Sequence, residues 1–219
     1  MKLTKESIIY EDNSILVLHK PAGVASETKR IVEEDCVSFV KNHIGPPDPY
    51  CALINRLDQP VEGIVLFAKT PEAAGKLSED MRNGRIEKEY LARVHVEGSI
   101  RDEGEETLSD HIIREKDGNK SRIAGKGEKG AKKAELRYTL LERDDDTALL
   151  KIRLMTGRHH QIRVQLSHAG LPIVGDRKYG YMPDGYRGSL CLAAVALKFN
   201  DPGNGRLMEL RIDGDGRLF

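Results

Sequence analysis

The chain has 219 residues, a length that suits one ordinary domain or two small ones. Its longest apolar run, residues 190–197, has eight residues, whereas a membrane-spanning helix needs about 20. The first residues alternate charged and apolar side chains and contain no hydrophobic signal core. Its three cysteines are far apart and form no C-x-x-C pair, which argues against a disulfide scaffold and an ordinary zinc site. Membrane proteins, secreted precursors and disordered chains are therefore excluded, and we expect a cytoplasmic protein with free thiols.

The formal net charge is zero, but its distribution along the chain is uneven. Residues 1–113 hold 14 lysines and arginines against 21 acidic residues, and residues 114–219 hold 21 against 14. A basic half favours contact with a polyanion such as nucleic acid, while a solvated surface is the ordinary alternative. Charge alone does not decide between these two interpretations.

In the first part of the chain, the apolar pattern predicts three strands and two helices. Residues 7–21 have β-branched and apolar residues on both sides of a polar turn at 11–13 and predict a pair of strands. Residues 33–44 have helical spacing and end at Gly45-Pro46-Pro47, and residues 63–68 predict a buried strand. Thr70 and Pro71 then suit a helix start, because threonine caps and proline fits the first helical position.

The second part of the chain reads mainly as strands. Alternating residues predict strands at 87–97, 136–141 and 148–154, and two closing strands are predicted at 190–199 and 207–212. Only one helix is predicted, at 158–169. Residues 117–133, rich in glycine and lysine, predict a flexible surface loop or hairpin, and 170–188 predict a long irregular stretch. We therefore expect a single α/β domain over residues 1–219, with a mixed, largely antiparallel sheet and flanking helices.

Common cofactor and metal motifs are absent from the sequence. It contains no H-E-x-x-H, P-loop, G-x-S-x-G or dinucleotide glycine fingerprint. His159 and His160 are adjacent, so on a helix they diverge by about 100° and cannot both face one metal ion. We expect no metal and no cofactor.

Two polar clusters are candidates for the functional site. Arg56-Leu57-Asp58 precedes the predicted buried strand, where the aspartate is either a salt-bridged strand cap or a functional carboxylate. Residues 156–163 concentrate polar donors at a predicted helix start, where backbone N–H groups also attract anions. The residues alone leave catalysis and simple phosphate binding open for this second cluster.

From end to end, the sequence resembles the RluA-type family of pseudouridine synthases. Five stretches match the family's motifs in order over about 170 residues. They are Tyr10-Glu11-Asp12 through Lys20-Pro21-Ala22-Gly23; Arg56-Leu57-Asp58 with Gly63 and Ala68-Lys69; Lys88-Glu89-Tyr90-Leu91-Ala92; Thr156-Gly157-Arg158 with His160-Gln161-Ile162-Arg163 and Leu166; and Pro172–Asp176 with Tyr179-Gly180.

The resemblance implies the pseudouridine synthase fold and the isomerisation of uridine to pseudouridine in structured RNA, either ribosomal or transfer RNA. It makes Asp58 the catalytic carboxylate, a group able to attack or stabilise an electron-poor sugar centre. Bonding to C1′, bonding to C6 and abstraction of a ribose proton all stay open for it. The resemblance implies that Arg163 pairs with Asp58 and keeps it ionised, and that Tyr90 stacks on the extruded base.

Further residues are expected to hold the RNA. Substrate-binding roles follow from the same motifs for Arg56, Arg158, His160, Gln161 and Leu166. Arg56 would help to extrude the target nucleotide or hold a phosphate, and Leu166 would floor the uracil pocket or pack in the core. Residues 151–187, with seven basic and two acidic residues, would contact phosphates.

The sequence departs from the family pattern at several positions. Asn55 stands where the family usually has histidine, and Val61-Glu62 stand where it usually has Thr-Ser. Other departures are His159, Gln165, Ala193 and Asp201. These residues bear on the shape of the site and on the substrate. The resemblance begins close to residue 1, so we expect no S4 RNA-binding domain, and we expect a monomer.

Two other functions compete with this interpretation. A non-catalytic RNA-binding protein on the same fold is the main alternative, and the presence of Asp58, Tyr90 and Arg163 argues against it. A glycoside hydrolase normally needs two carboxyl groups, and Glu62 is the one nearby candidate for the second.

Overall fold

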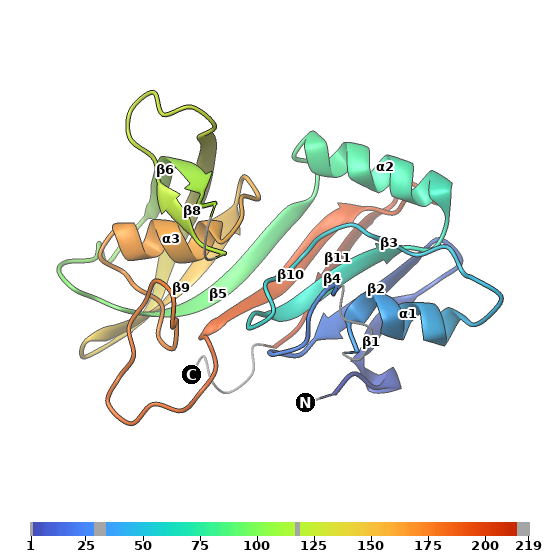
Figure 1. Ribbon diagram of the computed structural model, residues 1–219, viewed down its shortest axis with the longest axis horizontal. Helices are drawn as coiled ribbons and strands as arrows, with labels where there is room; N and C mark the ends of the chain where they lie inside the picture. The colour runs from blue at the N-terminus through green and yellow to red at the C-terminus, as the bar shows by residue number, and fades with distance from the viewer. Residues whose placement is uncertain (1, 29–33, 117–118, 214–219) are drawn as a thin grey trace. The chain divides into compact units, whose positions relative to one another are not determined.

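The computed structural model describes residues 2–28, 34–116 and 119–213 (Figure 1). These residues divide into two compact units. Unit 1 comprises the described residues of 1–87 and 194–213, and unit 2 comprises those of 88–193. The predicted mixed α/β fold, with a largely antiparallel sheet and flanking helices, is confirmed. The expectation of a single domain stays a prediction.

Unit 1 is built on an antiparallel arrangement of strands with two helices. A short 3-10 turn, Lys5–Ser7, leads into strands ordered β1-β2-β4-β10, with β11 paired to β10 and β3 paired to β4. The bounds of these elements are β1 Ile8–Glu11, β2 Ile15–Lys20, α1 Cys36–Ile44, β3 Ala52–Leu53, β4 Glu62–Ala68, α2 Pro71–Arg82, β10 Leu192–Asn200 and β11 Leu207–Arg211.

Both faces of the β2–β4 pair are covered, so these strands are apolar on consecutive residues rather than on alternate ones. Ile15 and Val17 pack with Leu77 of α2 in one core cluster. Alternation along the strand places Leu16 and Leu18 on the opposite face, together with Lys20, whose neighbours include Cys36 of α1. The sequence predicted both strands correctly because burial on two faces leaves a continuous apolar run.

Local signals set the helix ends in unit 1. The Asp35 side chain accepts a hydrogen bond from the Ser38 amide, so α1 begins at Cys36 rather than at the predicted residue 33. Residues 29–33 lie outside the described part of the chain. The predicted start of α2 is confirmed, because Thr70 accepts from the Ala73 amide and Pro71 occupies the first turn.

Gly63 in β4 is required by the close approach of β10. Its φ is +135°, a value that disfavours side chains, and a Cβ at this position would lie 2.3 Å from the Ala194 carbonyl oxygen. Because β10 lies so close to β4 here, only glycine fits at position 63.

Unit 2 consists of antiparallel strands in the order β5-β9-β8-β6-β7, with α3 in contact with β6 and β7 (Figure 1). Their bounds are β5 Glu87–His95, β6 Glu105–Arg114, β7 Ser121–Ile123, β8 Lys132–Asp144, β9 Thr147–Leu154 and α3 Gln161–His168. Residues 169–191 contain no helix or longer strand, as predicted for 170–188.

Two predictions for unit 2 need correction. For 117–133, predicted as a loop or hairpin, the hairpin is present and the plain loop is not: Ser121–Ile123 forms β7, which pairs antiparallel with Ile112–Arg114 of β6, while residues 117–118 are outside the described part of the chain. The predicted helix 158–169 begins at Gln161, because His160 has a left-handed φ of 55° and residues 156–160 form a turn instead.

Candidate active site

The turn that carries Asp58 is tied to the segment after β2 by hydrogen bonds on both sides of the aspartate. The Ser26 hydroxyl bonds both the amide and the carbonyl of Leu57, at 3.1 and 2.9 Å. The Gln59 carbonyl accepts from the Gly23 amide, and the Gln59 side chain donates back to the Gly23 carbonyl. Asp58 itself is partly buried. The backbone of this carboxylate therefore has a fixed position within unit 1.

Lys20 is the buried cation of this region. Its ammonium group donates to three carbonyl oxygens, those of Pro21, Val24 and Gln59, at 3.1, 2.7 and 3.1 Å. Burial lowers the pKa of Lys20 to about 8. The nearby negative charges of Asp58 and Glu62 act in the opposite direction and raise this pKa, but burial has the larger effect. Lys20 thus ties the Asp58 turn to the end of β2 and places a positive charge near both carboxylates.

Asn55 has a structural role that the sequence did not show. Its side-chain amide donates to the Ile64 carbonyl at 3.0 Å, and its side-chain oxygen accepts from the Leu66 amide at 2.7 Å. The buried amide therefore completes the hydrogen bonding of one edge of β4, three residues before Asp58.

Two more predicted residues of unit 1 have protein partners. Glu62 is buried and pairs with His19 at 2.9 Å, so the candidate second carboxylate is engaged by a side chain of β2. The side chain of Arg56 is 68% exposed, and its Nη1 atom lies 3.6 Å from Oε2 of Glu27. This exposure leaves Arg56 accessible to an RNA phosphate, and that role stays a prediction.

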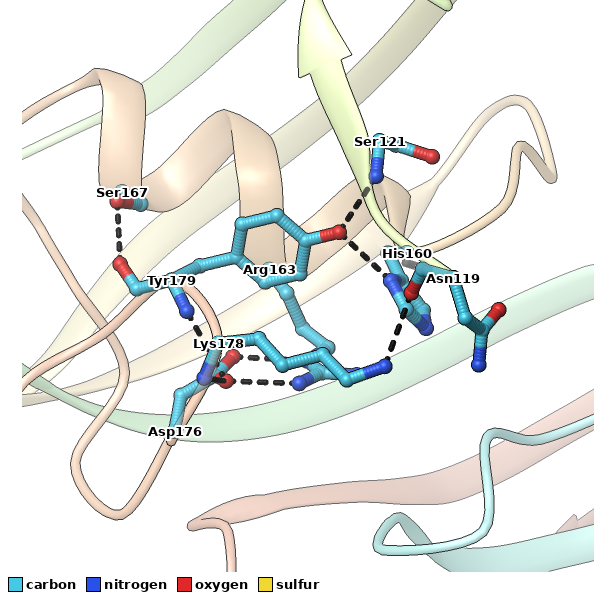
Figure 2. Close-up of polar contacts among 8 residues, drawn as sticks. All are labelled: Asn119, Ser121, His160, Arg163, Ser167, Asp176, Lys178 and Tyr179. Carbon is cyan, nitrogen blue, oxygen red and sulfur yellow. Dashed lines mark hydrogen bonds and ion pairs between the residues drawn. The ribbon is translucent and has the colours of Figure 1, made fainter. Parts of the chain in front are cut away.

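In unit 2, Arg163 is held by a residue that sequence reasoning did not select. Its Nε and Nη2 atoms donate to the two carboxylate oxygens of Asp176, each at 2.7 Å (Figure 2). Both side chains are buried, with 5% and 0% of their surface exposed. Burial by itself raises the pKa of Asp176, but the hydrogen bonds and charge of Arg163 lower it below its ordinary value. The pair is therefore ionised at neutral pH.

The pairing predicted between Arg163 and Asp58 joins residues of different units. Asp176 is a partner of Arg163 that the sequence did not predict. Its presence does not test the pairing with Asp58, which stays a prediction. Asp176 lies in the Pro172–Asp176 stretch that matched a family motif, so its position was visible in the sequence but its partner was not.

The turn before α3 is closed by side-chain hydrogen bonds. The Gln161 side-chain oxygen accepts from the Thr156 hydroxyl at 2.7 Å and from the Arg158 amide at 3.0 Å, and its amide donates to the Glu135 carbonyl. Through these bonds, Gln161 stabilises the turn before α3. Its role in substrate binding stays a prediction. Arg158 is exposed, with Nε donating to the Lys133 carbonyl at 2.9 Å.

Other predicted residues of unit 2 are mostly buried. Tyr90 lies on β5 opposite Ile152 and is 6% exposed, and Leu166 is fully buried in α3. The imidazole of His160 stacks on His159 and has its Nδ1 atom 2.7 Å from the Tyr179 hydroxyl.

Lys88, two residues before Tyr90, is another partly buried cation. Its ammonium group lies beside Gly157, and burial lowers its pKa. Within the described residues, no group of three or more histidine, cysteine, aspartate or glutamate side chains is arranged to hold a metal ion. No described helix combines the length and apolar character needed to span a bilayer.

The chain matches known proteins over most of its length. The family profile described as RNA pseudouridylate synthase matches residues 14–168. The ribosomal large subunit pseudouridine synthase C of Yersinia pestis is 30% identical over 97% of this chain, and that of Salmonella typhimurium is 32% identical over 96%. The chain spans 67% of the length of each of these relatives.

Solved structures with the same fold include two human proteins. RNA Pseudouridylate Synthase Domain Containing 4 aligns with a TM-score of 0.77 and 21% identity, covering 97% of this chain and 90% of its own. RNA Pseudouridylate Synthase Domain Containing 1 aligns with a TM-score of 0.76 and 23% identity, covering 97% and 86%. At these identities the likeness supports the fold.

Proposed function

The chain belongs to the family of RNA pseudouridylate synthases, as its sequence resemblance indicated, and from this membership we propose that it modifies large-subunit ribosomal RNA with Asp58 as the catalytic carboxylate. The chain is an RNA pseudouridine synthase, an isomerase. The ribosomal substrate is supported by the names of the relatives, which are ribosomal large subunit pseudouridine synthases.

The reaction is an internal rearrangement of one nucleotide. The N1–C1′ bond of uridine breaks, the uracil turns, and a new bond forms between C5 and C1′. The proton on C5 is released and N1 gains a proton, so atoms and charge balance without an external group. We propose that Asp58 acts on the reacting nucleotide while the bond to N1 is broken.

The observation that carries this assignment is the double attachment of the Asp58 turn. Leu57 and Gln59, its two neighbours, are each hydrogen-bonded to the segment that follows β2, and the Lys20 ammonium group lies near the carboxylate. A partly exposed carboxylate on a fixed backbone is suited to meet a substrate in one orientation.

Tyr90 and Arg163 complete the proposed machinery in unit 2. Tyr90 offers an aromatic face for an extruded uracil, and its hydroxyl would assist removal of the C5 proton. Arg163, held ionised against Asp176, is proposed to pair with the Asp58 carboxylate as well. Leu166 and His160 are proposed to shape the base pocket.

RNA contact is proposed for the exposed basic side chains of unit 2. The stretch 114–133 contains eight lysines and arginines against three acidic residues. Its exposed lysines include Lys120, Lys126, Lys129 and Lys132, and the exposed arginines elsewhere in unit 2 include Arg158, Arg177 and Arg187. Such side chains position an RNA strand through its phosphates, whereas shape and splayed bases give specificity.

The test is isomerisation by the Asp58→Asn variant. The substrate is a large-subunit ribosomal RNA transcript labelled with tritium at C5 of uridine, and the readout is tritium released to water. We expect the parent to release tritium and Asp58→Asn to release none, while both bind the RNA equally. Asp48→Asn is the matched control, because Asp48 also lies in unit 1 but is 84% exposed beside Lys41.

Other outcomes separate the alternatives. A parent that binds RNA but releases no tritium would identify a non-catalytic RNA-binding protein. Release from transfer RNA and not from ribosomal RNA would correct the substrate. Activity unchanged by EDTA, at ionic conditions that keep the RNA folded, would support the prediction that no metal is needed.

The oligomeric state and compartment are also proposals. We propose a monomer located in the cytoplasm, a compartment that suits the three widely spaced cysteines of the sequence. Sedimentation of the purified protein and fractionation of cells that express it would check these two points.

A further inference from the structure

The segment Gly175–Gly180 is not used by the proposed reaction, yet it contributes two side chains that surround the Arg163 guanidinium. Asp176 binds the edge formed by Nε and Nη2. The guanidinium carbon Cζ lies over the Tyr179 ring, 5.2 Å from its centroid (Figure 2). One contact is a bidentate ion pair and the other is a cation–π contact.

Asp176 is itself immobilised by its own loop. One of its carboxylate oxygens accepts hydrogen bonds from the Lys178 and Tyr179 amides, at 2.9 and 3.3 Å, in addition to the bond from Arg163. Gly175, with φ +79°, makes this turn possible, since a Cβ there would lie 2.5 Å from the Ser189 carbonyl oxygen. The carboxylate therefore presents a fixed edge to Arg163.

Tyr179 is anchored at both ends. Its hydroxyl accepts from the Ser121 amide at 2.7 Å and lies 2.7 Å from Nδ1 of His160, while its carbonyl oxygen accepts from the Ser167 hydroxyl (Figure 2). These partners come from β7, from the residue before α3 and from α3 itself. The ring consequently has one orientation over the guanidinium.

The two contacts together determine the direction of Nη1. A guanidinium is planar, so a bidentate pair through Nε and Nη2 fixes the plane and the line along which Nη1 projects. The contact with the anchored Tyr179 ring opposes movement of Cζ away from that ring. The ion pair and the ring contact therefore restrict different motions of the guanidinium.

We propose that Asp176 and Tyr179 are positioning residues for uridine isomerisation, which hold the Arg163 guanidinium in one orientation for its part in the reaction. This inference rests on the proposed function of Arg163. The effect is on the rate of the chemical step rather than on RNA affinity, because both residues act through a side chain that is already buried.

The experiment compares Tyr179→Leu with Tyr181→Leu in the full chain. Tyr181 lies in the same irregular stretch and stacks on His95 at 3.9 Å, so its removal also deletes a ring packed against a neighbour. Single-turnover tritium release from the ribosomal RNA transcript, at increasing protein concentration, gives the maximal rate constant and the concentration for half-saturation. Circular dichroism and thermal melting verify that each variant is folded.

We expect Tyr179→Leu to lower the maximal rate constant by about 100-fold, the order of loss for a catalytic group displaced by about 1 Å. Half-saturation should be unchanged, and Tyr181→Leu should retain the parental rate. Tyr179→Phe keeps the ring and should recover most of the rate, and Asp176→Asn, which removes the charge that holds Nε and Nη2, should lose rate as Tyr179→Leu does.

A folded Tyr179→Leu variant with the parental rate would overturn the proposal, and so would equal losses in Tyr179→Leu and Tyr181→Leu. If Tyr179→Leu does not fold, the comparison of Tyr179→Phe and Asp176→Asn decides: equal parental rates in both would overturn it. Failure of the proposed function is distinct, since the parent would then release no tritium or Asp58→Asn would still release it.

Discussion

The Asp58 turn and the Arg163 side chain are held in different ways. Around Asp58 the turn is held by hydrogen bonds of its two neighbours, through the backbone of Leu57 and through the backbone and side chain of Gln59. Arg163 is held through its own charge, paired in a buried position with Asp176. The difference teaches that the bonds of neighbouring residues hold the backbone at Asp58, whereas the Arg163 guanidinium is held by its own ion pair, which a substitution of Arg163 would break.

Removal of the Arg163 charge should have the largest effect. Arg163→Met leaves the Asp176 carboxylate buried without its partner, and breaking a buried pair costs about 3–5 kcal/mol of unfolding free energy. Urea unfolding would measure this loss. The double variant Arg163→Met with Asp176→Asn should regain part of it, because the orphaned charge is gone. A single variant as stable as the parent would show that the pair contributes nothing.

Asn55 tests how strongly the region before Asp58 depends on hydrogen bonds to β4. Asn55→Ala deprives the Ile64 carbonyl and the Leu66 amide of their side-chain partner, at a cost of about 1–3 kcal/mol for buried unpaired groups. Urea unfolding gives the stability, and tritium release shows whether the turn keeps its activity. Stability equal to that of the parent would mean that this edge of β4 does not need the amide.

Lys20 should give the Asp58 region a measurable pH dependence. Its pKa is about 8 in the folded chain, against 10.5 ordinarily, so between these values the unfolded state binds more protons at this residue. The unfolding free energy of the parent, relative to Lys20→Met, should therefore rise as the pH increases from 8 to 10.5. Urea unfolding of both proteins across this range measures it, and a constant difference would contradict the burial argument.

An exposed arginine should show the smallest effect on stability. Arg187→Met removes a surface charge of unit 2 and should change the unfolding free energy by roughly 0–1 kcal/mol. If the side chain contacts a phosphate, the salt dependence of RNA binding should become less steep. Filter binding at several salt concentrations measures this slope. A stability loss as large as that of Arg163→Met would erase the contrast between buried and exposed arginines.

Local patterns in the sequence determined the elements of unit 1 well. Apolar runs marked β2 and β4, and the Thr70-Pro71 start marked α2, because these signals depend only on neighbouring residues. The ordered motifs also determined the family, and with it Asp58 as the candidate carboxylate.

Other features were decided by tertiary structure. Strand β6 alternates exposed and partly buried residues over most of its length, and β7 has only three residues, so their pairing with each other and with β8 defines them. The start of α3 is set by Gln161, whose side chain is engaged by Thr156 and by the Glu135 carbonyl of β8.

The partner of Arg163 shows the same division. The sequence identified both Arg163 and the stretch that contains Asp176, but 13 residues and a change of direction separate them. Their pairing, and the Tyr179 ring beside it, depend on how the segment after α3 folds back onto the helix. Spacing along a chain predicts which residues share a face of one element, whereas contacts between elements arise only when the core is packed.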